Sequence, residues 1–218
     1  MIIAIDGPSG SGKSTLGRML ARELNLLYID TGSMYRAVAL ATIEAGVDPH
    51  DSEAVVELAT RSDIDLEGDP DSLKVLLNGR DVTERIRSED VTTMSSVVST
   101  IPGVRRAMVA RQRELAQRGA VLNGRDIGTV VFPEADVKFF LTAAPEERAE
   151  RRFKEDRLTN HDVSFAETMA DMVERDRRDS TRADSPLKVA DDAIVIDSSG
   201  LSIEDVFLLM MKYVHRHH

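Results

Sequence analysis

The sequence predicts an α/β fold in which a parallel sheet is covered by helices on both faces. Two observations predict it: short apolar runs of strand length recur along the chain, and each is followed or preceded by a segment with helical spacing of apolar residues. Continuous apolar runs are typical of parallel strands, which are buried on both faces. The length of 218 residues fits one generous domain, or one domain with insertions. Five runs are candidate strands, at residues 2–5, 26–29, 120–122, 137–141 and 193–196.

The first two strands are each followed by a predicted helix. Ile2–Ile5 leads into a glycine-rich turn and then a helix that starts near Lys13. The second run, Leu26–Ile29, precedes a helix predicted over Met34–Ala45, because Gly46 is a typical helix-ending residue. The apolar residues that define the first helix are Leu16, Met19, Leu20 and Leu24.

The middle of the chain departs from this alternation. Apolar and acidic residues alternate over Ile64–Leu66, and a later apolar run ends at Asn78-Gly79, a dipeptide strongly favoured in two-residue hairpin turns. We therefore expect a small antiparallel insertion at about residues 63–85. Residues 88–117 then predict two helices with a break near Pro102.

Composition excludes several classes of protein. There are 28 basic and 38 acidic residues, a net charge of −10, which argues against a protein that coats nucleic acid. The absence of cysteine excludes disulfides, thiolate metal sites and cysteine catalysis. No apolar segment reaches the about 20 residues needed to span a membrane. Because no basic and apolar leader stands at the N-terminus, we expect a cytoplasmic protein.

The charges are unevenly distributed. Glu44–Asp90 holds 14 acidic and 5 basic residues, a local charge of −9, so the rest of the chain is close to neutral. Arginines outnumber lysines 22 to 6, and the planar guanidinium suits bidentate contact with phosphate. Eight arginines fall within Arg148–Arg182. For most of these arginines, the alternative to phosphate binding is a place on a solvated helix face that carries ion pairs. The acidic total disfavours long nucleic acids but not a small phosphorylated ligand held by local arginines.

The glycine-rich turn between the first strand and the first helix is the clearest functional motif. It has two glycines separated by four residues and followed by Lys and Ser, the pattern of a phosphate-binding loop. Glycines let successive backbone N–H groups point at one phosphate, and the helix N-terminus adds positive potential. Lys13 would bridge the β- and γ-phosphates, and the Ser14 hydroxyl would bind Mg²⁺. A glycine turn without a ligand is the alternative, but the strand before the motif and the helix after it favour a nucleotide site.

A phosphate loop alone does not separate a GTPase, an ATPase motor and a small-molecule kinase. No Asn-Lys-x-Asp motif occurs, which argues against a GTPase that reads guanine. No apolar strand ends in a clear Asp-Glu pair, which argues against a hydrolytic motor. Only His50 and His161 lie outside the C-terminal tail, so acid–base catalysis by histidine is not expected. Phosphoryl transfer by positioning and charge neutralisation remains, and arginines supply that chemistry. A regulatory ATP-binding module without catalysis is the alternative from another class. RNA binding gains no support without interleaved basic and aromatic patches. The tail, His215, His217 and His218, is not interpreted as a metal site.

Two polar clusters follow the second and third candidate strands. Asp30–Arg36 lies where the second strand ends, at the sheet edge where ligands bind in such folds. Thr31 and Ser33 are also candidates for the N-cap of the helix that follows. Asn123–Thr129 follows the third strand and places the dipeptide Arg125-Asp126 between two glycines. This arrangement indicates close approach of a ligand, with a structural ion pair as the alternative.

Four stretches together resemble bacterial cytidylate kinases, the (d)CMP kinase family. The resemblance covers essentially the whole chain, including the insertion peculiar to the bacterial form. It implies a P-loop nucleoside monophosphate kinase fold, a five-stranded parallel sheet with a helical lid, and ATP-dependent phosphorylation of CMP and dCMP to CDP and dCDP with Mg²⁺ in pyrimidine nucleotide metabolism. The stretches are Gly7–Thr15, Asp30–Arg36, Gly124–Pro133 (GRDIGTVVFP) and Glu174–Leu187 (ERDRRDSTRADSPL).

The same resemblance assigns roles by matched position. In the acceptor site, Asp126 would accept a hydrogen bond from the cytosine amino group, Asp179 would bind the ribose, and Arg125 would neutralise the acceptor phosphate. The implied CMP-binding residues are Thr31, Tyr35, Arg36, Ser96, Arg105, Arg125, Asp126, Asp179 and Arg182. The implied catalytic residues are Lys13, Arg125, Arg175 and Arg182. The implied ATP-binding residues are Gly7, Pro8, Ser9, Gly10, Ser11, Gly12, Lys13, Ser14, Thr15, Arg151 and Arg157.

The resemblance also implies a division of the chain. Residues 1–36, 113–147 and 164–218 would form the P-loop core, residues 37–112 the nucleoside-monophosphate-binding domain, and residues 148–163 a lid that closes over ATP, with Arg152 as a further candidate. We expect ATP and CMP or dCMP as the partners, a monomer, and neither nucleic acid nor membrane. Ser14 is the expected metal ligand, and Asp30 is a candidate second ligand through water.

The chemistry of the bases agrees with the role of Asp126. The cytosine N4 group is a donor that suits a carboxylate, whereas uracil presents an acceptor at that position. We therefore expect discrimination against UMP of at least about tenfold, or about 1.4 kcal/mol. A P-loop kinase for another small acceptor, such as a different nucleotide or shikimate, is the alternative.

Overall fold

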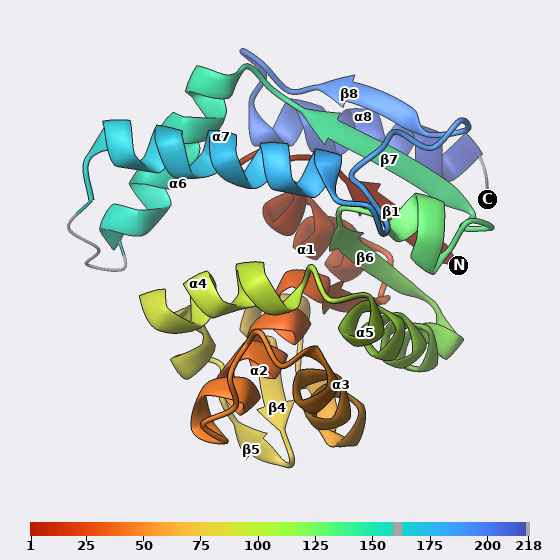
Figure 1. Cartoon of the computed structure of the whole chain (residues 1–218). Coiled ribbons are helices and arrows are strands. Elements are labelled where there is room, and N and C mark those ends of the chain that lie inside the picture. The colour runs from red at the N-terminus through yellow and green to blue at the C-terminus, as the bar shows by residue number, and fades with distance from the viewer. Residues whose placement is uncertain (159–162, 217–218) are drawn as a thin grey trace. The chain divides into compact units, whose positions relative to one another are not determined.

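The computed structural model describes residues 1–158 and 163–216, apart from the side chains of residues 156 and 158 (Figure 1). The contacts within it divide the chain into two compact units. Unit 1 consists of Met1–Leu20 and Asn123–His218, and unit 2 consists of Ala21–Leu122. The division into core, nucleotide-binding domain and lid concerns function and stays a prediction.

Within the described residues, five strands form one sheet in the order β2-β6-β1-β7-β8. β7 pairs in parallel with both β1 and β8, with Ile3 opposite Val137 and Phe139 opposite Ile194. Helices flank this sheet, so the predicted α/β fold is confirmed. The strands are β1 Ile2–Asp6, β2 Leu27–Asp30, β6 Ala120–Gly124, β7 Val137–Thr142 and β8 Ile194–Asp197.

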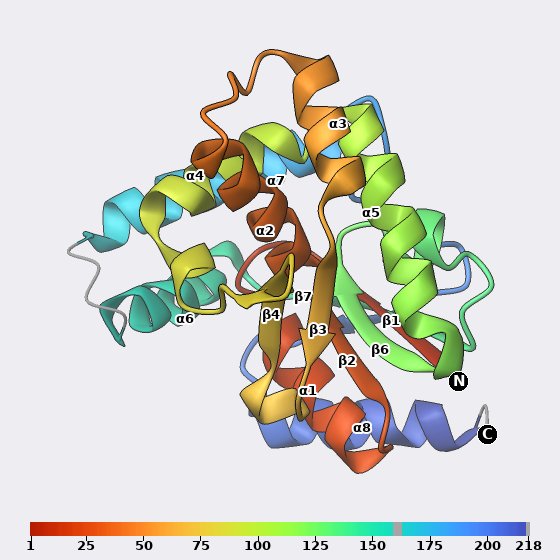
Figure 2. The same ribbon diagram turned by 90° about the horizontal axis from the view of Figure 1, so that it is seen from below.

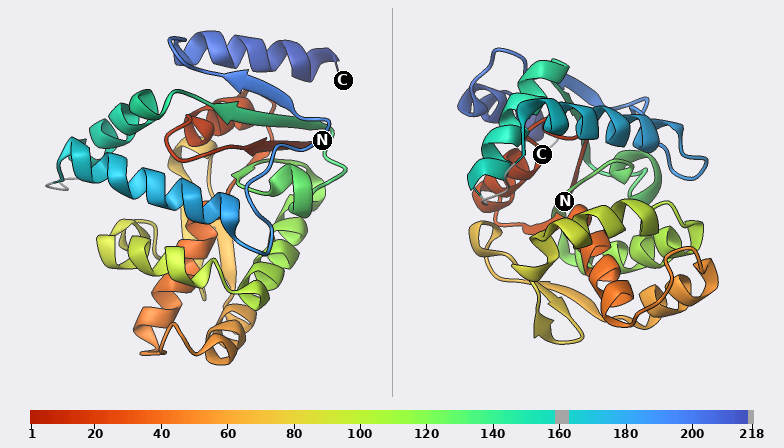
Figure 3. Two further views of the ribbon diagram at one scale, coloured as in Figure 1. Left: turned by 45° about the horizontal axis from the view of Figure 1, so that its top comes forward. Right: turned by 60° about the vertical axis from the view of Figure 1, so that its left-hand side comes forward.

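The helices of unit 1 pack in two ways, one against the sheet and two against each other. α8 packs against β7, and Figure 3 shows it running alongside β7 and β8. α6 and α7 pack against each other. α7 begins with a capping box: Ser164 accepts from the Glu167 N–H, and the Glu167 carboxylate accepts from the Ser164 N–H. The helices are α1 Lys13–Glu23, whose last three residues fall in unit 2, α6 Pro145–Leu158, α7 Phe165–Thr181 and α8 Ile203–Arg216.

In unit 2, the antiparallel insertion is confirmed. β3 (Ile64–Glu67), β4 (Lys74–Leu77) and β5 (Arg80–Asp81) form a second sheet, and Figure 2 shows β3 beside β4. Leu77 pairs with Arg80, which leaves Asn78 and Gly79 as a two-residue turn. Both turn residues have positive φ angles, 51° and 76°, as a type I′ turn requires.

The helix after β2 begins earlier than the sequence predicts. α2 covers Thr31–Glu44, and its N-cap is Asp30, whose carboxylate accepts from the Ser33 N–H. The prediction of a start near Met34, capped by Thr31 or Ser33, was therefore wrong. Asp30 ends β2 and caps α2 at the same time, so no linker separates the two elements.

The predicted break near Pro102 is confirmed. α4 ends at Val98, and α5 begins at Pro102, a residue tolerated in a first helical turn because it lacks an N–H. The remaining helices of unit 2 are α3 Ser52–Arg61, α4 Glu89–Val98 and α5 Pro102–Leu115. Short helical turns lie at Pro70–Ser72, Arg85–Arg87, Ala116–Arg118 and, in unit 1, Ile127–Val131. In the part of the chain that the structure describes, no helix is long and apolar enough to cross a membrane.

Candidate active site

The glycine-rich loop connects β1 to α1 and depends on glycine at two close approaches to backbone. Gly7 and Gly10 have positive φ angles of 148° and 71°. A Cβ on Gly7 would collide with the Leu141 carbonyl oxygen, and a Cβ on Gly10 would lie 2.5 Å from the carbonyl oxygen of Arg148. The loop is therefore shaped against the end of β7 and the first turn of α6.

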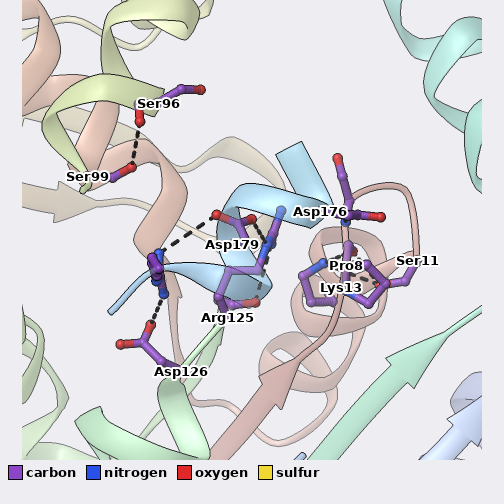
Figure 4. Close-up of polar contacts among 12 residues, drawn as sticks. Pro8, Ser11, Lys13, Ser96, Ser99, Arg125, Asp126, Asp176 and Asp179 are labelled. Atoms are coloured by element: carbon purple, nitrogen blue, oxygen red, sulfur yellow. Dashed lines mark hydrogen bonds and ion pairs between the residues drawn. The ribbon is translucent and has the colours of Figure 1, made fainter. Parts of the chain in front are cut away.

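Lys13 is buried at the start of α1 and turns back onto the loop. Its ammonium donates to the Pro8 carbonyl and to Ser11 Oγ at 3.3 Å, as Figure 4 shows. Burial lowers the pKa of Lys13 well below its usual value, and the charges of Arg125 and Arg175 lower it further. A phosphate anion close to these three cations would favour their charged forms.

Two residues that sequence analysis missed hold this loop. Asp176 on α7 accepts from the Ser9 N–H at 3.2 Å and from the Arg148 guanidinium. Arg148 on α6 also donates to the Ser9 carbonyl at 3.0 Å and to the Ala143 carbonyl at 3.1 Å. Both backbone polar groups of Ser9 are thus held by charged side chains. The only feature of the sequence that could have pointed to Asp176 is its position one helical turn before Asp179.

A second charged cluster lies in unit 1 at the end of β6 and the end of α7. Arg125 Nε donates to Asp179 Oδ2 at 2.7 Å, and Figure 4 shows the two side chains facing each other. Arg182 lies 3.6 Å from Asp126 and 3.8 Å from Asp179, and it donates through Nε to the Ser185 carbonyl at 2.7 Å. The structure therefore brings together four of the residues predicted to bind CMP.

Electrostatics keeps Asp179 ionised. Burial by itself would raise the pKa of this carboxyl, but the positive charges of Arg125, Arg175 and Arg182, with the hydrogen bond from Arg125, lower it below its usual value. Arg175, on α7, thus acts on both Asp179 and Lys13. The predicted catalytic residues of unit 1 therefore share one electrostatic environment.

Asp6 is a third residue that sequence analysis missed. It is the last residue of β1 and is 4% exposed. Its carboxylate oxygens accept from the Ile127 N–H at 2.8 Å and the Gly128 N–H at 2.7 Å. Burial raises its pKa to about 6, although the two hydrogen bonds and the charge of Lys13 act in the opposite direction. A charged residue at the end of an apolar strand, next to the phosphate loop, was the signal available in the sequence.

The Ser14 hydroxyl lies at the end of the loop and accepts from the side-chain amide of Asn123 at 3.0 Å. Over residues 1–158 and 163–216, no group of three or more His, Asp or Glu side chains is placed to hold a metal ion. The Ser14 hydroxyl is a hard oxygen of the kind that binds Mg²⁺ together with water and substrate phosphates.

In unit 2, the start of α2 carries three of the predicted CMP-binding residues. Thr31 is buried in the first turn, and Arg36 turns back to lie 3.4 Å from the Asp30 carboxylate. The guanidinium of Arg105, on α5, lies over the Tyr35 ring at 5.4 Å from its centroid.

The fourth and fifth predicted residues of unit 2 lie on α4 and α5. Ser96 is half-buried on α4, with its hydroxyl 3.5 Å from the Thr92 carbonyl. Arg105 also donates to the Ser99 carbonyl, at 3.2 Å, which holds α5 to the end of α4. The structure therefore links Tyr35, Arg105 and the end of α4 within one unit.

The arginines predicted to contact ATP from the lid have protein partners in the structure. Arg151 donates to the Ser198 hydroxyl and carbonyl, each at 2.9 Å, and Arg157 lies over the Phe153 ring at 5.8 Å from its centroid. Part of the predicted lid, residues 159–162, lies outside the described residues, as do His161, His217 and His218. The roles of Arg151 and Arg157 toward ATP stay predictions.

Comparison with known proteins gives a consistent result. The family described as Cytidylate kinase matches residues 3–216. A cytidylate kinase of Solibacter usitatus is 51% identical over 98% of this chain and 92% of its own length, and one of Desulforamulus reducens is 50% identical over 98% and 96%. Among solved structures, an uncharacterized protein from Eubacterium ventriosum has a TM-score of 0.52 at 13% identity, over 99% of this chain and 98% of its own, which concerns the fold alone.

Proposed function

Because the chain belongs to the cytidylate kinase family, we propose that it transfers the γ-phosphoryl group of ATP to CMP and dCMP, producing CDP and dCDP. The observation that carries this proposal is identity of about half the residues to curated cytidylate kinases over almost the whole chain. The phosphate loop with its buried Lys13, and the Arg125–Asp179 pair beside Asp126, supply the chemistry that such a transfer requires.

The donor half of the reaction uses the loop between β1 and α1. The loop backbone and Lys13 would bind the β- and γ-phosphates, and Arg175 would add positive charge close to Lys13. The clamp of Arg148 and Asp176 on Ser9 keeps the loop in its shape. Preorganisation of this kind stabilises the developing charge on the transferred group without a structural rearrangement during the reaction.

For the acceptor half, the proposal assigns roles to residues of each unit separately: the second cluster of unit 1 and, in unit 2, residues at the start of α2, on α4 and on α5. Asp126 would accept from the cytosine N4 amino group, and Arg125 and Arg182 would neutralise the CMP phosphate. Asp179 would bind the ribose, a role for which its lowered pKa suits it, because an ionised carboxylate is a strong acceptor. Thr31, Tyr35, Arg36, Ser96 and Arg105 would complete the binding of the sugar, phosphate and base.

Magnesium is implied by the family and fits the Ser14 hydroxyl, a hard oxygen ligand oriented by Asn123. When bound, Mg²⁺ neutralises charge on the phosphates of ATP. Asp30 is less suited to a second contact, because its carboxylate already caps α2 and accepts from Arg36. The lid at residues 148–163, a cytoplasmic location and a monomeric state are further parts of this proposal.

An acceptor panel tests the reaction. ADP formation from ATP is measured with CMP, dCMP, UMP, AMP, GMP and shikimate, and we expect CMP and dCMP to be preferred over UMP by at least about tenfold. Preference for any other acceptor would contradict the proposal. Tight ATP binding without ADP formation in the presence of any acceptor would favour a regulatory module instead.

The same assay tests Asp126. Replacement of Asp126 by alanine removes the base contact, and we expect kcat/KM for CMP to fall by about tenfold to a hundredfold, with a smaller preference for CMP over UMP. Asp191→Ala, which removes an exposed carboxylate of the same unit, is the control and should leave both values unchanged. Full activity of Asp126→Ala with CMP would refute the base-reading role.

A further inference from the structure

We propose that Asp6 is a positioning residue for the phosphoryl acceptor: its carboxylate holds the backbone directly after Arg125 and Asp126 and thereby aims these two side chains. The inference rests on the proposed function, because it assumes that Arg125 and Asp126 contact CMP. In this proposal Asp6 does not itself contact the nucleotide. Its role is exerted through the segment that it holds.

The geometry of this contact is specific for a carboxylate. Both oxygens of Asp6 are used, one by the Ile127 N–H at 2.8 Å and the other by the Gly128 N–H at 2.7 Å. Two adjacent backbone donors thus converge on one side chain, in the way that an anion is bound at a helix N-terminus. The helical turn Ile127–Val131 begins at the residue after Asp126, so the carboxylate fixes the point at which that turn starts.

The surroundings of Gly128 keep this contact in register. A Cβ at Gly128 would lie 3.4 Å from Asp6 Oδ2 on one side and 3.1 Å from Lys138 Cδ on the other. Lys138 is held in turn by Asp192 at 2.8 Å and by the Pro133 carbonyl, which belongs to the end of the same segment. The backbone after Asp126 is therefore held by Asp6 near its start and by Lys138 at its end.

The position of Asp6 in the sequence connects the two halves of the reaction. Asp6 is the last residue of β1, and the phosphate loop begins with the next residue, Gly7. One residue is therefore joined covalently to the ATP-binding loop and by two hydrogen bonds to the acceptor-binding segment. A shift of either segment relative to the other would have to break the contacts of Asp6.

The ionised state of Asp6 is costly, which indicates a role other than stability. Burial raises its pKa to about 6, and the charged groups that act on it are Asp126, which raises the pKa, and Lys13, which lowers it. A raised folded-state pKa means that its contribution to stability is present below the usual value of 3.8 and is lost as the pH rises through about 6. At neutral pH the carboxylate is therefore retained at the expense of folding stability.

The test compares Asp6→Asn with Asp136→Asn. Asp136 is a matched control in the same unit, because its carboxylate also accepts a backbone N–H, that of Ile2, at the opposite end of the same strand. An asparagine at position 6 keeps one acceptor but turns an amide N–H₂ toward the second backbone donor. Steady-state kinetics with ATP, CMP and UMP, unfolding in denaturant at pH 7, and kcat/KM for CMP from pH 5 to pH 8 are measured for both variants and the wild type.

We expect Asp6→Asn to lower kcat/KM for CMP by about tenfold or more and to reduce the preference for CMP over UMP. The KM for ATP and the unfolding midpoint should change no more than in Asp136→Asn. The CMP phosphate itself titrates near pH 6, so the pH profiles are compared between variants. The decline of kcat/KM for CMP below pH 6 should be steeper in the wild type and in Asp136→Asn than in Asp6→Asn.

Two outcomes would overturn the proposal: unchanged kinetics with CMP in Asp6→Asn, or equal losses toward ATP and CMP together with a lower unfolding midpoint. If Asp6→Asn fails to fold, Gly128→Ala is the second variant. Its methyl group would crowd Lys138 Cδ at 3.1 Å and touch Asp6 Oδ2 at 3.4 Å, so it should disturb the same backbone segment and reduce kcat/KM for CMP in the same direction by less. Normal CMP kinetics in Gly128→Ala would then count against the proposal. Failure of wild-type protein to phosphorylate CMP would instead reject the proposed function.

Discussion

The same kinds of ion pair occur in two regions of this chain, in very different surroundings. The phosphate-site pairs of unit 1, Arg125–Asp179, Arg148–Asp176 and Arg182–Asp126, are largely buried. In the acidic segment, residues 44–90, pairs such as Arg85–Asp90 are about half exposed, with side-chain exposures of 46% and 51% against 8% and 7% for Arg182–Asp126.

This difference decides what each pair contributes. An exposed pair is screened by water and salt, so it adds little to stability and fixes little geometry. Loss of one partner from a buried pair leaves a charge without compensation, which is strongly destabilising. The phosphate-site pairs therefore hold the predicted site residues in place, whereas exposed pairs of the acidic segment, such as Arg85–Asp90, lie on a solvated surface.

The largest effect is expected for Arg125→Ala. It removes a predicted phosphate contact and leaves the buried Asp179 without its 2.7 Å partner. We expect kcat/KM for CMP to fall by about a hundredfold or more and the free energy of unfolding to fall by about 3 to 5 kcal/mol.

Unfolding in denaturant at two pH values sharpens this prediction. At pH 7 the Asp179 carboxylate, left with only the charges of Arg175 and Arg182 near it, is ionised and costly. At pH 4 it can be protonated, so the loss of stability should be smaller there. The double variant Arg125→Ala/Asp179→Asn should regain stability without regaining activity. A fully active Arg125→Ala would remove the functional distinction between the two regions.

An intermediate effect is expected for Asp176→Ala. This change frees the Ser9 N–H and one donor of Arg148, so the phosphate loop loses its clamp. We expect the KM for ATP to rise by about tenfold, the KM for CMP to change less, and stability to fall by about 1 to 3 kcal/mol. Asp171→Ala, an exposed carboxylate on the same helix, is the control. Equal effects of the two substitutions on the KM for ATP would argue against the clamp.

The smallest effect is expected for Asp90→Asn in the acidic segment. Hydrogen bonds from Arg85 and then Ser88 lower the pKa of Asp90, so any stability that it contributes is present above its usual pKa and is lost only as the pH falls well below that value. At pH 7 we expect no measurable change in activity and a change in the urea midpoint that disappears at high salt. A clear loss of CMP phosphorylation would show that the acidic segment takes part in the reaction.

Sequence patterns predicted the fold well because they depend on short-range regularities. Apolar runs mark β1 and β7, Asn78-Gly79 marks the hairpin turn through its positive φ angles, and Pro102 marks the start of α5. The start of α2 was misplaced because Asp30 serves both as the last residue of β2 and as the helix cap, which periodicity does not reveal.

The candidate site was predicted only in part, for a different reason. The loop and the Arg125-Asp126 dipeptide stand in local motifs, but Asp6, Arg148 and Asp176 act through contacts between residues distant in the sequence. The Ser9 N–H and Asp176 are 167 residues apart, and Asp6 and Gly128 are 122 apart. Nothing in the local pattern singles out Arg148 among 22 arginines.

The close backbone contacts of Gly7 and Gly10 have a consequence for evolution. These glycines leave room for the Leu141 and Arg148 carbonyl oxygens, so selection for a folded chain alone would retain them. A descendant that had lost its chemistry would still carry the glycine pattern. Residues that no such close backbone contact requires, Lys13 above all, are the better markers of whether a related chain remains a working kinase.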